Sequence, residues 1–113
     1  ATAPLWAHHS FWVEFDVTQP VVLKGTITKV EWINPHAWLH LDVKSPDGAV
    51  EAWMIEGGSA AALLTRGFTT RTLLPGMVVS VEGYRSKNRA LRANGGDITF
   101  ADGTTLFFAF SKM

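Results

Sequence analysis

The chain has 113 residues, a length that supports one domain with its own core and is too short for two. Ten basic residues balance ten acidic ones, so the chain lacks the positive charge with which proteins bind nucleic acid or anionic membranes, and we expect no nucleic-acid partner. It contains no cysteine, which excludes disulfides, thiolate ligands and thiol nucleophiles, and no apolar run reaches the roughly 20 residues of a membrane-spanning helix.

Residues 1–18 predict an exported protein with an N-terminal segment that docks on the domain. Residues 1–7 are small and uncharged, as expected of the remainder left by signal-peptide removal, which favours a periplasmic location. His8 and His9 come next, and Trp12 and its neighbours are too apolar for a free tail. Docking of this segment would fix both imidazoles in place.

The next residues predict three strands. Residues 21–31 are rich in β-branched side chains and indicate a long, curved first strand, in which Gly25 marks a bulge or bend. The Asn34-Pro35 pair interrupts the pattern, because proline cannot donate a hydrogen bond to a sheet. Residues 36–44 and 50–56 predict the second and third strands.

The second half predicts a short helix and further strands. Ser59 can cap a helix over residues 60–66, residues 77–84 indicate a fourth strand, and residues 91–100 and 104–110 a closing hairpin. This order is that of an OB-fold. We therefore predict one all-β domain, a small OB-fold-like antiparallel barrel of five to six strands over residues 19–110, with one short helix between strands 3 and 4. An open antiparallel sandwich is the alternative.

Two of the four histidines lie on the predicted second strand. Side chains alternate along a strand, so His36, Trp38, His40 and Asp42 share the face opposite an apolar row. His36 and His40 are roughly 13 Å apart at about 3.3 Å per residue, too far to bind one metal ion together. A metal site must therefore combine one of them with a residue from elsewhere.

The docked His8 or His9 is the obvious metal-binding partner, with Glu31, Asp42, Glu56 or Met54 as further ligands. A thioether beside histidine and tryptophan suits Cu(I), although methionine is more often core filler. For each strand histidine, a hydrogen-bonded surface residue is the simpler interpretation. Ligand-binding or interface roles are predicted for five residues: Trp12, Asn34, Trp38, Met54 and Glu56.

Two motifs carry a resemblance. HHSF at residues 8–11 and NPHAW at residues 34–38, with LPGMVVSVEGY at residues 74–84, resemble a family of small exported bacterial proteins of unknown function. The resemblance implies a periplasmic location, supplies no activity and covers residues 8–108. It marks as signature positions His8, His9, Ser10, Phe11, Asn34, Pro35, His36 and Trp38.

The sequence contains no GxSxG, HExxH or glycine-rich phosphate loop, and we expect neither catalytic residues nor an enzyme. The leading hypothesis is a periplasmic binding protein whose histidines, His8, His9, His36 and His40, supply a site for a transition metal, copper before zinc. The second is an interaction module that packs against an envelope protein or another copy of the chain. The third is a barrel that binds a small molecule.

Overall fold

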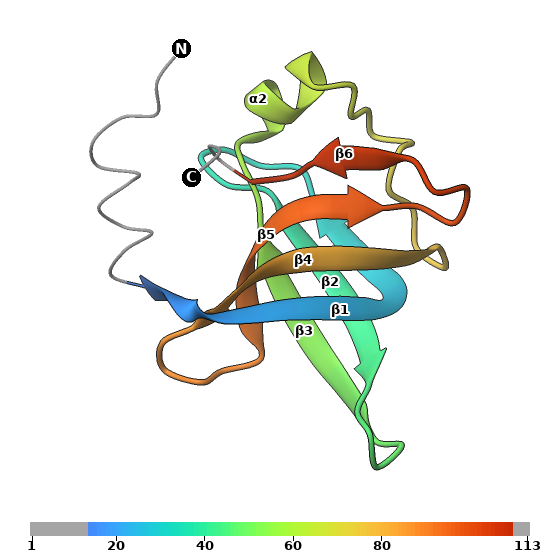
Figure 1. Cartoon of the computed structure of the whole chain (residues 1–113). Helices are drawn as coiled ribbons and strands as arrows, with labels where there is room; N and C mark the ends of the chain where they lie inside the picture. Colours follow the sequence, from blue (N-terminus) through green and yellow to red (C-terminus); the bar gives the residue numbers. More distant parts are fainter. Residues whose placement is uncertain (1–13, 110–113) are drawn as a thin grey trace.

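The structure, a computed structural model, describes residues 14–109 and is built mainly of strands (Figure 1). In chain order its elements are β1 (Phe15–Glu31), β2 (Trp38–Lys44), β3 (Val50–Glu56), α2 (Ala60–Thr65), β4 (Val78–Ser86), β5 (Arg92–Thr99) and β6 (Thr105–Phe107). No helix within residues 14–109 is long and apolar enough to cross a membrane.

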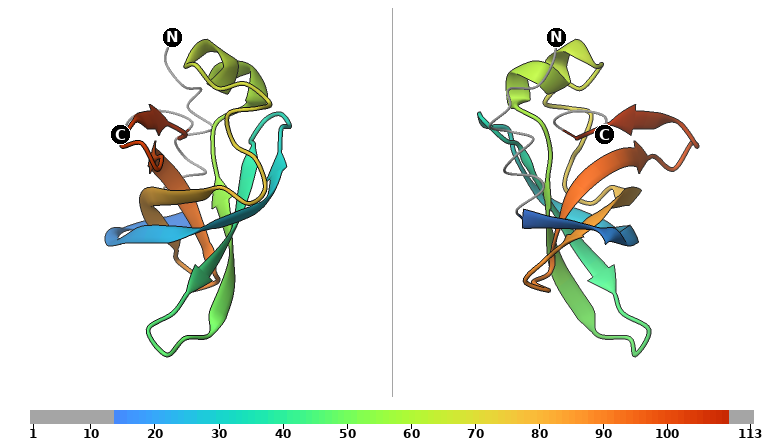
Figure 2. Two further views of the ribbon diagram at one scale, coloured as in Figure 1. Left: turned by 90° about the vertical axis from the view of Figure 1, so that its right-hand side faces the viewer. Right: turned by 60° about the vertical axis from the view of Figure 1, so that its left-hand side comes forward.

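Five strands close into a ring. The sheet order is β3-β2-β1-β4-β5-β6, and β3 also pairs with β5, so the ring runs β1-β2-β3-β5-β4 and β6 lies outside it against β5. The β3–β5 pairing is parallel, whereas the other pairings are antiparallel. Figure 2 shows the β2–β3 hairpin extending beyond the ring. The predicted OB-like barrel with one helix between the third and fourth strands is confirmed.

The core follows from the alternation of side chains. On β2 the apolar row points inward: Leu39 is 0% exposed and Leu41 1%. The opposite row of β2, which carries Trp38 and His40, therefore faces outward. The third strand repeats the pattern, with Trp53 and Ile55 buried in the same cluster.

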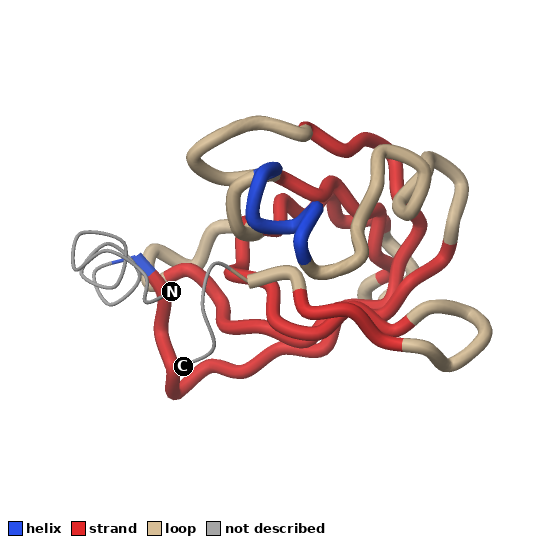
Figure 3. Tube along the Cα trace, turned by 90° about the horizontal axis from the view of Figure 1, so that it is seen from above, coloured by secondary structure: helices blue, strands red, loops and turns tan. Residues whose placement is uncertain are grey.

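Helix α2 lies across one end of the barrel (Figure 3). The Ser59 side chain accepts a hydrogen bond from the Ala62 N–H, as predicted for the cap, and Leu63 is fully buried. The helix ends at Thr65, one residue before the predicted end, and Arg66 is its C-cap. The Arg66 guanidinium donates to the carbonyl of Ala109, which fastens the helix to the chain after β6.

The first strand begins at Phe15, six residues before the predicted start, and carries an irregularity that decides which side chains face outward. Ile27 pairs with Leu41 but Lys29 pairs with His40, so the extra residue lies at Thr28 rather than at the predicted Gly25. Without it, Lys29 and Glu31 would share the inward face with Ile27. The bulge therefore places the Glu31 carboxylate on the outside of the barrel. Gly25 does not lie at the bulge: at this residue β1 is paired with both of its neighbouring strands, β2 and β4.

The segment between β1 and β2 holds His36 in place. The sequence predicts a second strand from His36, but the observed strand starts at Trp38, and the Asn34–Pro35 bond before it is cis. The Ala37 N–H donates to the Gly58 carbonyl and the Gly57 N–H donates to the Ala37 carbonyl. His36 is thus tied to the end of β3 without belonging to a strand.

Candidate functional site

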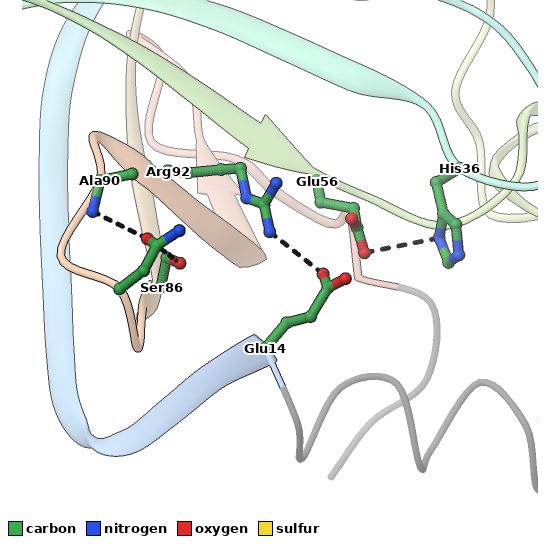
Figure 4. A network of polar contacts seen from close by, with 7 residues as sticks. Glu14, His36, Glu56, Ser86, Ala90 and Arg92 are labelled. Atoms are coloured by element: carbon green, nitrogen blue, oxygen red, sulfur yellow. Dashed lines mark hydrogen bonds and ion pairs between the residues drawn. The ribbon is translucent and has the colours of Figure 1, made fainter.

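The outer surface of β1, β2, β3 and β5 carries two rows of side chains that we call the histidine face. Directly paired residues of neighbouring strands lie on the same face, so each row can be followed across the sheet. The first row is Glu31, Trp38, Glu56 and Asn94, and the second is Lys29, His40, Met54 and Arg92. His36 lies beside Glu56 of the first row, and Glu14 pairs with Arg92 of the second (Figure 4).

His36 is oriented by the chain at the end of β3. Its Nδ1 is 3.1 Å from the Gly57 carbonyl oxygen and 3.7 Å from Oε1 of Glu56. A carbonyl oxygen only accepts, so Nδ1 carries the hydrogen and Nε2 of the neutral ring carries the lone pair. A ring fixed in this way through its Nδ1 is typical of metal-binding histidines, whose other nitrogen is the ligand.

Glu56 lies between His36 and a second carboxylate, that of Glu14 (Figure 4). Its side chain is only 13% exposed. Burial raises the pKa of the Glu56 carboxyl, and the negative charge of Glu14 raises it further, while His36 and Arg92 oppose both effects. Ionisation of Glu56 in the folded protein therefore lowers the stability of the fold.

We expect Glu56→Gln to stabilise the fold at neutral pH and to leave it nearly unchanged in acid. The pKa of Glu56 in the folded state is above its ordinary value of 4.5, so the folded state binds more protons than the unfolded state does. The free energy of unfolding of the wild type therefore falls as the pH rises from the unfolded-state pKa to the folded-state pKa. A tenfold change in the proton dissociation constant corresponds to about 1.4 kcal/mol. Urea unfolding of both proteins at about pH 4 and about pH 8 measures the effect. Equal stability differences at both values would contradict it.

Arg92 connects Glu14 to the aromatic part of the face. Its Nη2 is 3.2 Å from Oε2 of Glu14, and its guanidinium carbon lies 5.7 Å from the Phe15 ring centroid and 5.9 Å from that of Trp38. The Lys87 N–H also donates to the Glu14 carbonyl. Glu14, the residue before β1, is thus held on the histidine face by its side chain, and its backbone carbonyl is bonded to the loop after β4.

His40 has a different carboxylate partner. Its Nε2 is 3.0 Å from Oε2 of Glu31, and this hydrogen bond is the main cause of the lowered pKa of the Glu31 carboxyl. Lys29 also pairs with Glu31, at 3.5 Å. The face therefore holds two separate histidine–carboxylate pairs, with Trp38 in the strand position between the histidines.

The other predicted site residues have varied positions. Asn34 accepts a hydrogen bond from the Ala61 N–H at 3.4 Å, a contact between loop and helix. Met54 is 37% exposed and so does not fill the core. His8, His9 and Trp12 lie outside the described residues. Within residues 14–109 there is no group of three or more histidine and carboxylate side chains placed to hold a metal ion.

Sequence reasoning missed Glu14 and Arg92. Arg92 belongs to no motif, and it reaches the face only because β5 pairs in parallel with β3, where Arg92 lies beside Met54. A polar residue at the start of a strand is common, so the sequence offered no signal for Arg92. For Glu14 the sequence holds two hints: its place in the run HHSFxxEFD at residues 8–16, which is part of the family resemblance, and its place in the apolar segment predicted to dock.

No curated protein and no solved structure shows significant similarity to the chain. A family model does match, over residues 1–95, and its description is a family of unknown function, DUF6152. This match includes the histidine face up to Asn94. The chain belongs to this family of unknown function, DUF6152.

Proposed function

We propose that this chain is a periplasmic, non-enzymatic binding protein that holds a transition metal ion, copper before zinc, at His36. The observation that carries the proposal is the anchoring of the His36 ring through Nδ1 to the Gly57 carbonyl, 3.1 Å away, beside the Glu56 carboxylate. The Nε2 atom is then the metal ligand, and Glu56 acts behind the ring by making the imidazole more basic. This assigns Glu56 to orientation of the ligand rather than to direct coordination.

The second ligand in this proposal is His8 or His9. Glu14 borders the face through its ion pair with Arg92. His9 precedes Glu14 by five residues, a span of at most about 17 Å in extended chain. Chain length therefore allows an imidazole of residue 8 or 9 to reach the histidine face, where it would share a metal ion with Nε2 of His36. Three ligands from residues 14–109 are not needed for such a site.

The donor chemistry supports copper as the first candidate. Imidazole nitrogen suits copper, zinc and nickel, and among divalent ions of the first transition row Cu(II) binds most tightly to a given set of nitrogen ligands. Trp38, half-buried on the same face, would shield the ion from water. The periplasmic part of the proposal rests on the resemblance of the HHSF and NPHAW motifs to exported proteins.

The test is a titration of the full chain with Cu(II) and with Zn(II). Cu(II) is expected to raise Tm, since an excess that leaves a free concentration about 100 times Kd stabilises the folded state by about 2.7 kcal/mol. His36→Ala should remove the rise. Glu56→Gln should keep the site but weaken binding about 10–100-fold, as expected for a group that orients a ligand.

His40→Gln is the matched control, because it removes an imidazole from the same face without touching His36. It should bind Cu(II) as the wild type does. An equal rise in Tm for the wild type and His36→Ala would contradict the proposal. A complete lack of response to either metal, together with a solution mass above that of one chain, would instead favour the interaction module.

A further inference from the structure

Met54 and His40 form a pair of soft donors on the histidine face, away from the His36 anchor. They are direct partners in the antiparallel β2–β3 register, and such partners have Cβ atoms about 4.5–5.5 Å apart. Met54 is 37% exposed and the His40 side chain 23%. The Met54 thioether therefore lies beside the His40 imidazole at the surface, where core packing does not explain the presence of a methionine.

Glu31 decides which nitrogen of His40 is available. Oε2 of Glu31 lies 3.0 Å from Nε2 of His40, and a carboxylate oxygen accepts hydrogen bonds, so Nε2 of His40 carries the hydrogen. The lone pair of the neutral ring is then on Nδ1. A carboxylate that holds the far nitrogen of a histidine is the usual partner of a metal-binding imidazole. The bulge at Thr28 supplies this partner by turning Glu31 outward.

The donor set selects the class of ion. A thioether sulfur is a poor ligand for Zn(II), which binds cysteine, histidine and carboxylate side chains, and for Mg(II), which binds oxygen. One imidazole nitrogen and one thioether sulfur match a monovalent ion with a filled d shell, which accepts two soft ligands. The neighbouring cations are already paired, Lys29 with Glu31 at 3.5 Å and Arg92 with Glu14 at 3.2 Å, which reduces their repulsion of a single positive charge.

We infer that Nδ1 of His40 and Sδ of Met54 form a second metal site, specific for a soft monovalent ion such as Cu(I). This site shares no ligand with the His36 site and does not depend on it. A chain with both sites would hold the two oxidation states of copper at separate places on one face.

The experiment uses Ag(I), a redox-inert ion of the same class, added to the full chain in chloride-free buffer. Binding is measured by calorimetry and by the NMR shifts of the methionine methyl groups. One equivalent should shift the Met54 methyl. Met54→Leu, which keeps the volume, and His40→Gln should each abolish this binding, and Glu31→Gln should weaken it about 10–100-fold.

Met77→Leu is the matched control. The Met77 sulfur already accepts a hydrogen bond from the Leu74 N–H, so this variant should bind Ag(I) as the wild type does. Unchanged Ag(I) affinity in Met54→Leu, or loss of affinity in Met77→Leu, would overturn the inference. His36→Ala separates the two sites: it should lose Cu(II) but keep Ag(I), whereas loss of Ag(I) binding there would assign the silver to His36 and also overturn the inference.

Discussion

Phe108→Ala is expected to lower the free energy of unfolding by about 3–5 kcal/mol, the cost of removing a fully buried aromatic side chain. Phe108 is 0% exposed, and its ring packs against that of Phe68 with 5.9 Å between the centroids. The ring also fills the space under Gly57, where an added Cβ would lie 2.6 Å from it. Urea unfolding should show a lower midpoint with an unchanged slope.

Phe107→Ala is the matched control for this substitution. Phe107 is the neighbouring residue and the same amino acid, but it is only partly buried and contacts the Arg66 guanidinium at 5.2 Å. Its loss should cost less than about 2 kcal/mol, because the ring leaves little cavity behind. Similar costs for the two variants would show that Phe108 does not have the central packing role described.

Gly83→Ala should also destabilise strongly, by about 3 kcal/mol, at the upper end of the range for overpacking. A Cβ on Gly83 would lie 2.1 Å from the carbonyl oxygen of Asn94 and 3.0 Å from its carbonyl carbon. Both atoms are backbone and belong to β5, so relief requires β4 and β5 to separate. Thermal unfolding should detect the loss as a fall in Tm of more than about 10 °C.

Gly96→Ala tests whether this cost comes from the clash or from the loss of a glycine. Gly96 lies in the same pair of strands, but its added Cβ would meet only the Glu82 carbonyl oxygen, at 3.3 Å. We expect a change of less than about 1 kcal/mol. Equal destabilisation by both alanines would contradict the steric explanation.

Much of the fold was predictable because local sequence patterns specify its strands and its helix. The apolar row of β2 alternates without a break, and Ser59 and the following alanines specify the start of α2. The first six residues of β1 were missed, since residues 16–20 contain only one apolar side chain besides proline, that of Val17, and show no alternation. The bulge at Thr28 was also misplaced, because β-branched residues surround it and a register shift depends on the partner strand.

The candidate site was predictable only in part. His36, Trp38, His40 and Met54 could be assigned to one region because they are close in the sequence or on successive strands. Glu56, which lies beside His36, is among the predicted residues, but the carboxylate partner of His40 could not be chosen, since Asp42 was as plausible as Glu31 and the bulge decides between them. Arg92 depends on a parallel pairing between strands that are far apart in the chain, which local patterns do not reveal.

The β3–β5 pairing, which closes the barrel, is the shortest ladder of the five-strand ring, with three residue pairs. Arg92 crosses this pairing from the β5 side, with its guanidinium over Trp38 of β2 and its ion pair to Glu14 at the start of β1. These contacts of Arg92 therefore reinforce the ring where it has the fewest paired residues. Transient opening of the barrel must first break them. Ligand binding at the histidine face and local opening of the β3–β5 pairing are consequently linked. A ligand that binds this face should therefore slow the amide hydrogen exchange of β3 and β5.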